Sequence, residues 1–166
     1  MNSIAQEGFT YIVEVIHRDG TRSQREVVHN LVPLEGLNHM MSVTFKAATA
    51  NPNWFLGVYE GNYTPTSAIT AATIAATATE STAYASGTRV ACMFGAVANG
   101  SVDNSATPAL FVMTSNKTLY GGFMVSSSTK GGGSGVLTSA VRFSSPKVLE
   151  KDDTLSVIAG NTLTSS

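Results

Sequence analysis

Apolar and polar residues alternate with a period of two at the start of the chain, which is the pattern of a half-buried β-strand. Residues 9–17 show this alternation, and Asp19-Gly20 follows as a hairpin signal, because glycine tolerates the positive φ of a type I′ turn. Residues 21–28 form the return strand, whose outward charges suit a sheet edge. We therefore predict a flexible N-terminal arm at 1–8 and a hairpin at 9–28.

One stretch shows a helical period instead. Pro33 suits the first helical position because its missing N–H is no loss there, and apolar residues then recur at i, i+3, i+7 and i+11. The stripe consists of Leu34, Leu37, Met41, Thr44 and Phe45. We predict a single short helix near 33–46, followed by an aromatic strand at 53–60. We expect the helix and this strand to form the floor of the core.

The rest of the chain has short apolar runs separated by turn residues, which indicates further strands. They are predicted at 88–96, 109–114, 119–126, 136–143 and 154–163, with 88–96 buried because its apolar run is continuous. We expect 109–114 and 119–126 to pair across the turn at 115–118, and the last two strands to flank turns at 145–146 and 151–153. This pattern predicts a mainly β fold, an antiparallel two-sheet sandwich that is jelly-roll-like, with an immunoglobulin-like topology as the alternative.

Two segments lack either period. Residues 66–87 are rich in Ala and Thr, and we interpret them as an extended, low-complexity excursion over the surface that pairs with a neighbouring subunit. Residues 130–135 are rich in glycine and predict a flexible hairpin tip. Residues 9–166 would then form one domain, since 166 residues suffice for a single sizeable core.

Charged residues make up only 13% of the chain, and the net charge is −1. This balance argues against nucleic-acid binding, which needs clustered Lys and Arg. Residues 61–79 carry no charge, but polar residues interrupt them too often for a membrane span. The single Cys92 excludes an internal disulfide, and we interpret it as a buried apolar residue of a protein assembled in a reducing compartment. The first eight residues lack the basic start and apolar block of a signal peptide.

Candidate chemistry is sparse. The three histidines, His17, His29 and His39, lack the spacing of a zinc site, and the glycine run lacks the phosphate-loop pattern. Two carboxylates, Glu60 and Glu80, flank aromatic residues that could hold a carbohydrate, although such aromatics are more often core residues. These aromatics are Trp54, Tyr59, Tyr63 and Tyr84. We expect no enzymatic activity, no cofactor and no metal.

Several segments carry a family likeness. HNLVPLEGLNHMMSVTFK (29–46), WFLGVYEGNYTP (54–65) and ATESTAY (78–84) with Arg89 resemble structural proteins of tailed bacteriophages. So do GGFMVSSSTKGGGSGVL (121–137) and FSSPKVLEKDDTLSV (143–157). The likeness covers most of the chain from Asn30 onward, and its motifs are structural rather than catalytic. It points to the head-decoration, or capsid cement, proteins.

The resemblance implies a sandwich that binds the outer surface of the capsid lattice and stabilises the mature head by bridging major capsid subunits. The partners would be the major capsid protein and further copies of this chain, as a trimer or alternatively a dimer, with no nucleic acid and no membrane. The location would be the virion, after assembly in the cytoplasm of the host bacterium. Candidate contacts with the capsid or a sister subunit are Ile4, Phe9, Tyr11, Arg22, Tyr63, Ile69, Ile74 and Tyr84. The alternative is a tail-fibre or tail-associated module that recognises bacterial surface glycan.

Overall fold

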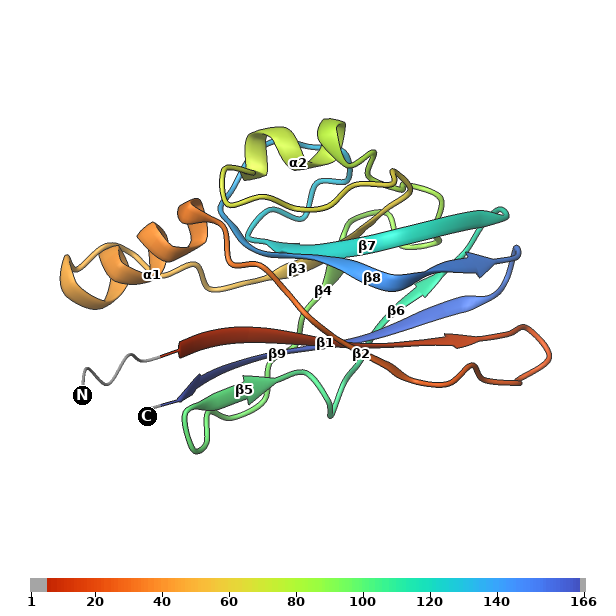
Figure 1. Cartoon of the computed structure of the whole chain (residues 1–166), viewed down its shortest axis with the longest axis horizontal. Helices are drawn as coiled ribbons and strands as arrows, with labels where there is room; N and C mark the ends of the chain where they lie inside the picture. The colour runs from red at the N-terminus through yellow and green to blue at the C-terminus, as the bar shows by residue number, and fades with distance from the viewer. Residues whose placement is uncertain (1–5, 165–166) are drawn as a thin grey trace.

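The computed structural model describes residues 6–164, in which two antiparallel sheets lie against each other (Figure 1). The first sheet has the order β2-β1-β9-β5, with β6 also paired to β9. Its strands are β1 (Gln6–Ile16), β2 (Glu26–His29), β5 (Ser101–Asp103), β6 (Ala109–Val112) and β9 (Thr154–Thr164). The second sheet has the order β4-β3-β7-β8, formed by β3 (Phe55–Tyr59), β4 (Val90–Ala91), β7 (Lys117–Val125) and β8 (Leu137–Leu149). The predicted mainly β, two-sheet sandwich is confirmed.

The main core lies between the two sheets. The period-two pattern of β1 buries one face, as the sequence predicts, and this face consists of Phe9, Tyr11, Val13 and Val15. Leu56 and Val58 belong to the same core and come from β3 of the opposite sheet. Tyr11 also donates or accepts a hydrogen bond at 2.8 Å with the Ser139 hydroxyl of β8, so a buried polar contact joins the sheets.

A second core lies on the outer side of the second sheet, beneath α2 (Ala71–Thr77). Ile74 of α2 and Ile69 before it pack there with Phe123 of β7 and Leu137 of β8. Figure 1 shows α2 above the β7–β8 pair, on the side away from the first sheet. The second sheet is therefore covered on both faces, which explains why the run from Phe123 to Val125 is continuously apolar and buried.

The predicted irregular excursion at 66–87 is wrong in its centre, because α2 lies there. Thr70 and Thr73 form a reciprocal capping box at the helix N-terminus. Ile74 is fully buried and supplies the tertiary contact that so short a helix needs. A helix of seven residues has few positions that face the core, and here they are Ala71 and Ile74, so no repeated apolar stripe appears in the sequence.

The expected pairing of 109–114 with 119–126 is also wrong. β6 pairs with β9 in the first sheet, and β7 pairs with β3 and β8 in the second. The connection at 113–116 therefore crosses between sheets instead of closing a hairpin, and residues 117–118 of the predicted turn belong to β7. Along the chain, two strands join one sheet and the next two join the other, so the strands on either side of such a change lie in opposite layers.

Two other predicted segments differ from the structure. Only Val90 and Ala91 of the predicted strand 88–96 are paired as strand. After them, the Cys92 N–H donates to the Trp54 carbonyl and the Gly95 N–H donates to the Asp103 carbonyl. This segment therefore bridges the two sheets. The predicted turn at 145–146 lies inside β8, whose position at a sheet edge accommodates Pro146 without loss of a ladder hydrogen bond.

The N-terminal hairpin is confirmed, with β2 at the sheet edge as expected, although β2 begins at Glu26. β1 starts at Gln6 and pairs with the end of β9, so residues 6–8 belong to the sheet rather than to a flexible arm.

Candidate functional site: the outward face of helix α1

Helix α1 (Leu34–Phe45) is attached to the sandwich through the side that carries the buried Gly36 and the half-buried Glu35, Met40 and Val43. Gly36 is its one buried residue, and a Cβ there would lie 2.8 Å from the Thr138 Cα and 2.9 Å from the Leu137 carbonyl oxygen. The helix backbone therefore lies directly on β8. Only glycine permits this approach.

Glu35 fixes the same side of the helix. Its Oε2 accepts hydrogen bonds from the backbone N–H of Ala71 at 2.8 Å and of Leu137 at 2.7 Å. One carboxylate thus joins the first turn of α1 to the start of α2 and the start of β8. Together with the close approach at Gly36, these bonds determine which side of α1 faces the protein.

The expectation that the apolar stripe of α1 faces the core is wrong. The exposed fractions are 55% for Leu34, 38% for Leu37, 59% for Met41 and 71% for Phe45. Thr44 is exposed as well. We call Leu34, Leu37, Met41 and Phe45 the α1 face. An aligned row of large apolar side chains in water is typical of a contact surface for another macromolecule.

A groove of about 560 Å³ runs beside the C-terminal half of α1. Met41 and Phe45 form its helix side, and Trp54 and Leu163 contribute from before β3 and from β9. His39 holds the groove together: the Asn51 amide donates to its Nε2 at 3.1 Å, and its ring meets Trp54 edge-on at 5.9 Å between centroids. The groove is mainly apolar and continuous with the α1 face.

A second hollow of about 230 Å³ shares Trp54 and is lined by Met93 and Phe94. Met93 is exposed, so apolar surface continues past the groove. Cys92 lies at this hollow but is buried, and burial raises the pKa of its thiol to about 12. The thiol is therefore protonated at neutral pH and acts as an apolar core residue, as the sequence suggests.

The candidate contacts chosen from sequence do not assemble into one surface. Ile4 lies outside the described residues. Phe9, Tyr11, Ile69, Ile74 and Tyr84 are all at most 5% exposed, so their side chains fill the cores and present no surface to a partner. Tyr63 is half-buried against the second core. Arg22 is exposed, and its Nη1 donates to Glu14 Oε2 at 3.0 Å.

The sequence did mark the α1 face, but with the opposite orientation. The signal that could have corrected it lies on the other side of the helix, where Met40 and Val43 follow Gly36 at i+4 and i+7 and form a second apolar row. Gly36 in that row permits the helix backbone to approach a neighbouring strand closely.

The aromatic residues considered for a carbohydrate site form no exposed platform. Tyr59 and Tyr84 are buried, which raises the pKa of both hydroxyls. Trp54 packs against the main core and Tyr63 against the second. Tyr84 instead stacks edge-on with Phe111, and the Lys130 ammonium lies 3.7 Å from the centre of its ring.

The Glu80 side chain is buried and forms an ion pair with Arg89. The Arg89 Nε donates to Glu80 Oε1 at 2.8 Å, and its Nη2 donates to Oε2 at 2.7 Å. Arg89 also donates to the carbonyls of Ser127 and Gly132, while the Gly131 N–H donates to Glu80. The glycine-rich segment expected to be a flexible tip is therefore held by a buried ion pair.

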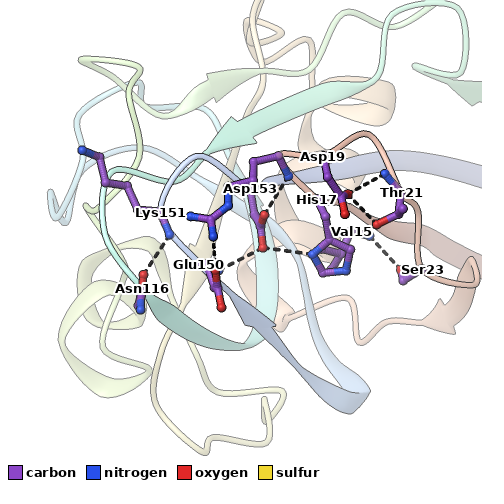
Figure 2. Close-up of polar contacts among 10 residues, drawn as sticks. Val15, His17, Asp19, Thr21, Ser23, Asn116, Glu150, Lys151 and Asp153 are labelled. Atoms are coloured by element: carbon purple, nitrogen blue, oxygen red, sulfur yellow. Dashed lines mark hydrogen bonds and ion pairs between the residues drawn. The ribbon is translucent and has the colours of Figure 1, made fainter.

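A polar cluster lies at the opposite end of the sandwich from α1, where the β1–β2 hairpin meets the β8–β9 turn (Figures 1 and 2). Asp153 is at its centre. Its Oδ1 accepts from the Arg18 N–H at 2.9 Å, and its Oδ2 accepts from the Glu150 N–H at 3.0 Å and contacts His17 Nδ1 at 3.1 Å. The Glu150 and Arg18 N–H groups and His17 hold the pKa of this carboxyl below its usual value.

This cluster joins the β1–β2 hairpin of the first sheet to the end of β8 in the second. Ser23 lies in the same hairpin, and its hydroxyl accepts from the Val15 N–H (Figure 2) and donates to the Gln24 carbonyl. Within residues 6–164, no group of three His, Cys, Asp or Glu side chains is placed to hold a metal ion. None of the described helices is long and apolar enough to cross a membrane.

Comparison with known proteins adds no relative: no protein-family model matches the chain, and no curated protein matches it.

Proposed function

We propose that this protein is a structural protein of a tailed-bacteriophage virion, a cement protein on the outer surface of the capsid that bridges major capsid subunits and stabilises the mature head. The observation that carries the proposal is the α1 face. Four large apolar side chains point into solvent from a helix whose opposite side is fixed to β8 and α2. The helix cannot rotate to bury them without losing these bonds, so this apolar row stays available for contact with another protein. The phage assignment itself is supported by the sequence resemblance.

The second support is the outer edge of β8, the longest strand at the edge of a sheet. The outer edge of β8 is occupied by groups of the same chain: Leu137 N–H bonds to Glu35, Ala140 exchanges two hydrogen bonds with Leu31, and Ser144 N–H bonds to Glu26. Pro146 then removes a donor. Strand addition is therefore blocked along β8, which favours a contact through side-chain surfaces such as the α1 face.

A cement protein acts without chemistry. It binds the assembled lattice and not the separated subunits, so mass action shifts the equilibrium toward the assembled head. A copy that touches more than one subunit gains from effective concentration, and modest individual contacts suffice. The chain has few charged residues and many small polar ones, which suits a protein whose surface is packed against neighbours.

The test is the number of copies in purified particles of the phage that encodes the chain, measured by gel densitometry against the major capsid protein. Hundreds of copies are expected for a lattice component. A handful to a few tens would instead support the tail-module alternative. Absence from purified particles would overturn both.

A further inference from the structure

We infer that the outer face of the first sheet carries a second binding site, which takes an apolar side chain flanked by a carboxylate on a partner protein. The site is separate from the α1 face. The inference rests on the proposed function only for the identity of the partner, the capsid protein. A protein that bridges subunits needs two contact surfaces, and this site supplies the second.

The two sheets are covered differently. The second sheet has the main core on one face and the second core, with α2, on the other. Figure 1 shows α2 over the second sheet and α1 at one end of the sandwich, so no described helix lies over the outer face of the first sheet. That face nevertheless exposes large apolar side chains: Val27 is 56% exposed, Leu110 50% and Val112 40%. Apolar surface of this kind is available to a partner.

The cross-strand register builds a hollow into this face. Glu14 of β1 pairs with Ser156 of β9, which also pairs with Leu110 of β6. Ile12 and Ile158 pair with each other in the neighbouring row. Glu14 and Ser156 are buried, whereas the three apolar residues are half-buried or exposed, so a polar floor lies among apolar walls. The volume is about 280 Å³, and we call this site the first-sheet hollow.

Two arginines line the same hollow and give it a positive charge. Arg22 Nη1 donates to Glu14 Oε2 at 3.0 Å, and Arg25 Nε lies 3.7 Å from the same oxygen, beyond hydrogen-bond distance. The Arg22 and Arg25 side chains are 56% and 61% exposed, while the Glu14 side chain is only 11% exposed. Two exposed cations therefore face one sheltered carboxylate. Within residues 6–164 the Arg25 guanidinium donates no hydrogen bond, so its donors are open to a further acceptor.

This charge selects the partner. A guanidinium forms its strongest hydrogen bonds with a carboxylate, often through two N–H groups at once. A second copy that bound the hollow across a two-fold axis would bring the arginines of both copies together, and they would repel. Pockets for free small molecules usually span about 300–1,000 Å³, so the first-sheet hollow is better matched to one side chain of a protein. The partner segment thus places an apolar side chain between Ile12 and Ile158 and a neighbouring carboxylate on Arg25.

The experiment is a titration of the isotope-labelled full chain with two peptides, followed by backbone amide shifts in nuclear magnetic resonance spectra. The probe is acetyl-Gly-Leu-Asp-Gly-amide, and its control is acetyl-Gly-Leu-Asn-Gly-amide, which has the same shape without the charge. We expect the Asp peptide to shift the amides of Ile12, Glu14 and Ile158 with a millimolar dissociation constant. We expect the Asn peptide to bind about two- to five-fold more weakly, the range for an exposed ion pair.

Matched variants separate the two halves of the site. Arg25→Gln should bind the Asp and Asn peptides equally, whereas Arg18→Gln should keep the preference, because Arg18 is 63% exposed in the same hairpin but pairs with Glu150 outside the hollow. Leu110→Ser should weaken both peptides alike, and Val148→Ser, at an exposed position of the second sheet, should weaken neither. Circular dichroism and a denaturation midpoint check that each variant folds.

Equal affinity of the native chain for the two peptides, or amide shifts confined to other parts of the chain, would overturn the inference. The proposed function is measured separately, by occupancy of capsids that lack the protein. A native chain that occupies capsids but shows no preference for the Asp peptide would sink the first-sheet hollow and leave the cement role in place. A chain that is absent from particles but selects the Asp peptide through Arg25 would support the hollow and sink the cement role.

Discussion

Replacing Glu80 with glutamine measures how much the buried ion pair with Arg89 contributes to stability. The substitution preserves the shape of the side chain but removes its charge. The Arg89 guanidinium then stays buried, with both side chains at most 1% exposed, and keeps only neutral partners. The structure thus predicts an uncompensated cation in the interior.

The expected cost follows from this geometry. Removing one partner of a buried pair destabilises by about 3–5 kcal/mol, because the remaining charge has lost its compensation. With a urea m-value of about 2 kcal/mol/M, the unfolding midpoint should fall by roughly 2 M. Typical domains have only about 5–15 kcal/mol in total, so the variant should be markedly less stable yet still folded.

The matched control is Glu150→Gln. Glu150 pairs with Arg18 at 3.2 Å, but both side chains are exposed, so the expected loss is about 0–1 kcal/mol. Urea unfolding followed by tryptophan fluorescence reports both variants. Equal midpoints for Glu80→Gln and Glu150→Gln would refute the reasoning.

A second readout concerns the loop that the pair holds. Lys130 donates to the carbonyls of Thr82 and Tyr84, and its neighbour Gly131 donates to Glu80. We expect trypsin to spare the Lys130–Gly131 bond in the native chain and to cut it in Glu80→Gln. Equal resistance in the two proteins would mean that the loop does not depend on the pair.

Three further predictions follow from the packing and the titrating groups. Gly36→Ala should destabilise the fold although alanine favours helix, because its Cβ would lie 2.8 Å from the Thr138 Cα. The control Asn38→Ala, at an exposed site of the same helix, should not destabilise the fold. The midpoints of thermal unfolding compare the two variants. Asp153→Asn should cost about 1–3 kcal/mol at pH 7. The pKa of Asp153 is lower in the folded state, so its charge stabilises the fold above the unfolded pKa, and this stability is lost as pH falls through the folded pKa. The difference in unfolding free energy between the native chain and Asp153→Asn, measured by urea unfolding, should therefore become smaller below about pH 4. A difference that does not change with pH would contradict this. Cys92 should resist iodoacetamide at pH 8 in the native state and react in urea, because its buried thiol has a pKa of about 12; rapid native labelling, read by mass spectrometry, would show that the site opens.

The strands were predictable where a local pattern decides them. The alternation in residues 9–17 became the buried face of β1, and Asp19-Gly20 became the turn that begins the hairpin, with Gly20 at a φ of 86°. The pairing of strands was less predictable. Strands 109–112 and 117–125 are close in sequence, but each bonds to a distant strand because the chain changes sheets between them. A local pattern carries no information about which sheet a strand joins.

The candidate site shows the same division. The sequence by itself determined that residues 34–45 form a helix with an apolar stripe, since a helical period needs only neighbouring residues. Only the tertiary structure decided that this stripe faces outward. Gly36 rests on β8, and Glu35 bonds to backbone groups 36 and 102 residues away. The side of an amphipathic helix that becomes buried depends on where distant segments offer donors and room for close approach, and the period of the helix cannot encode that.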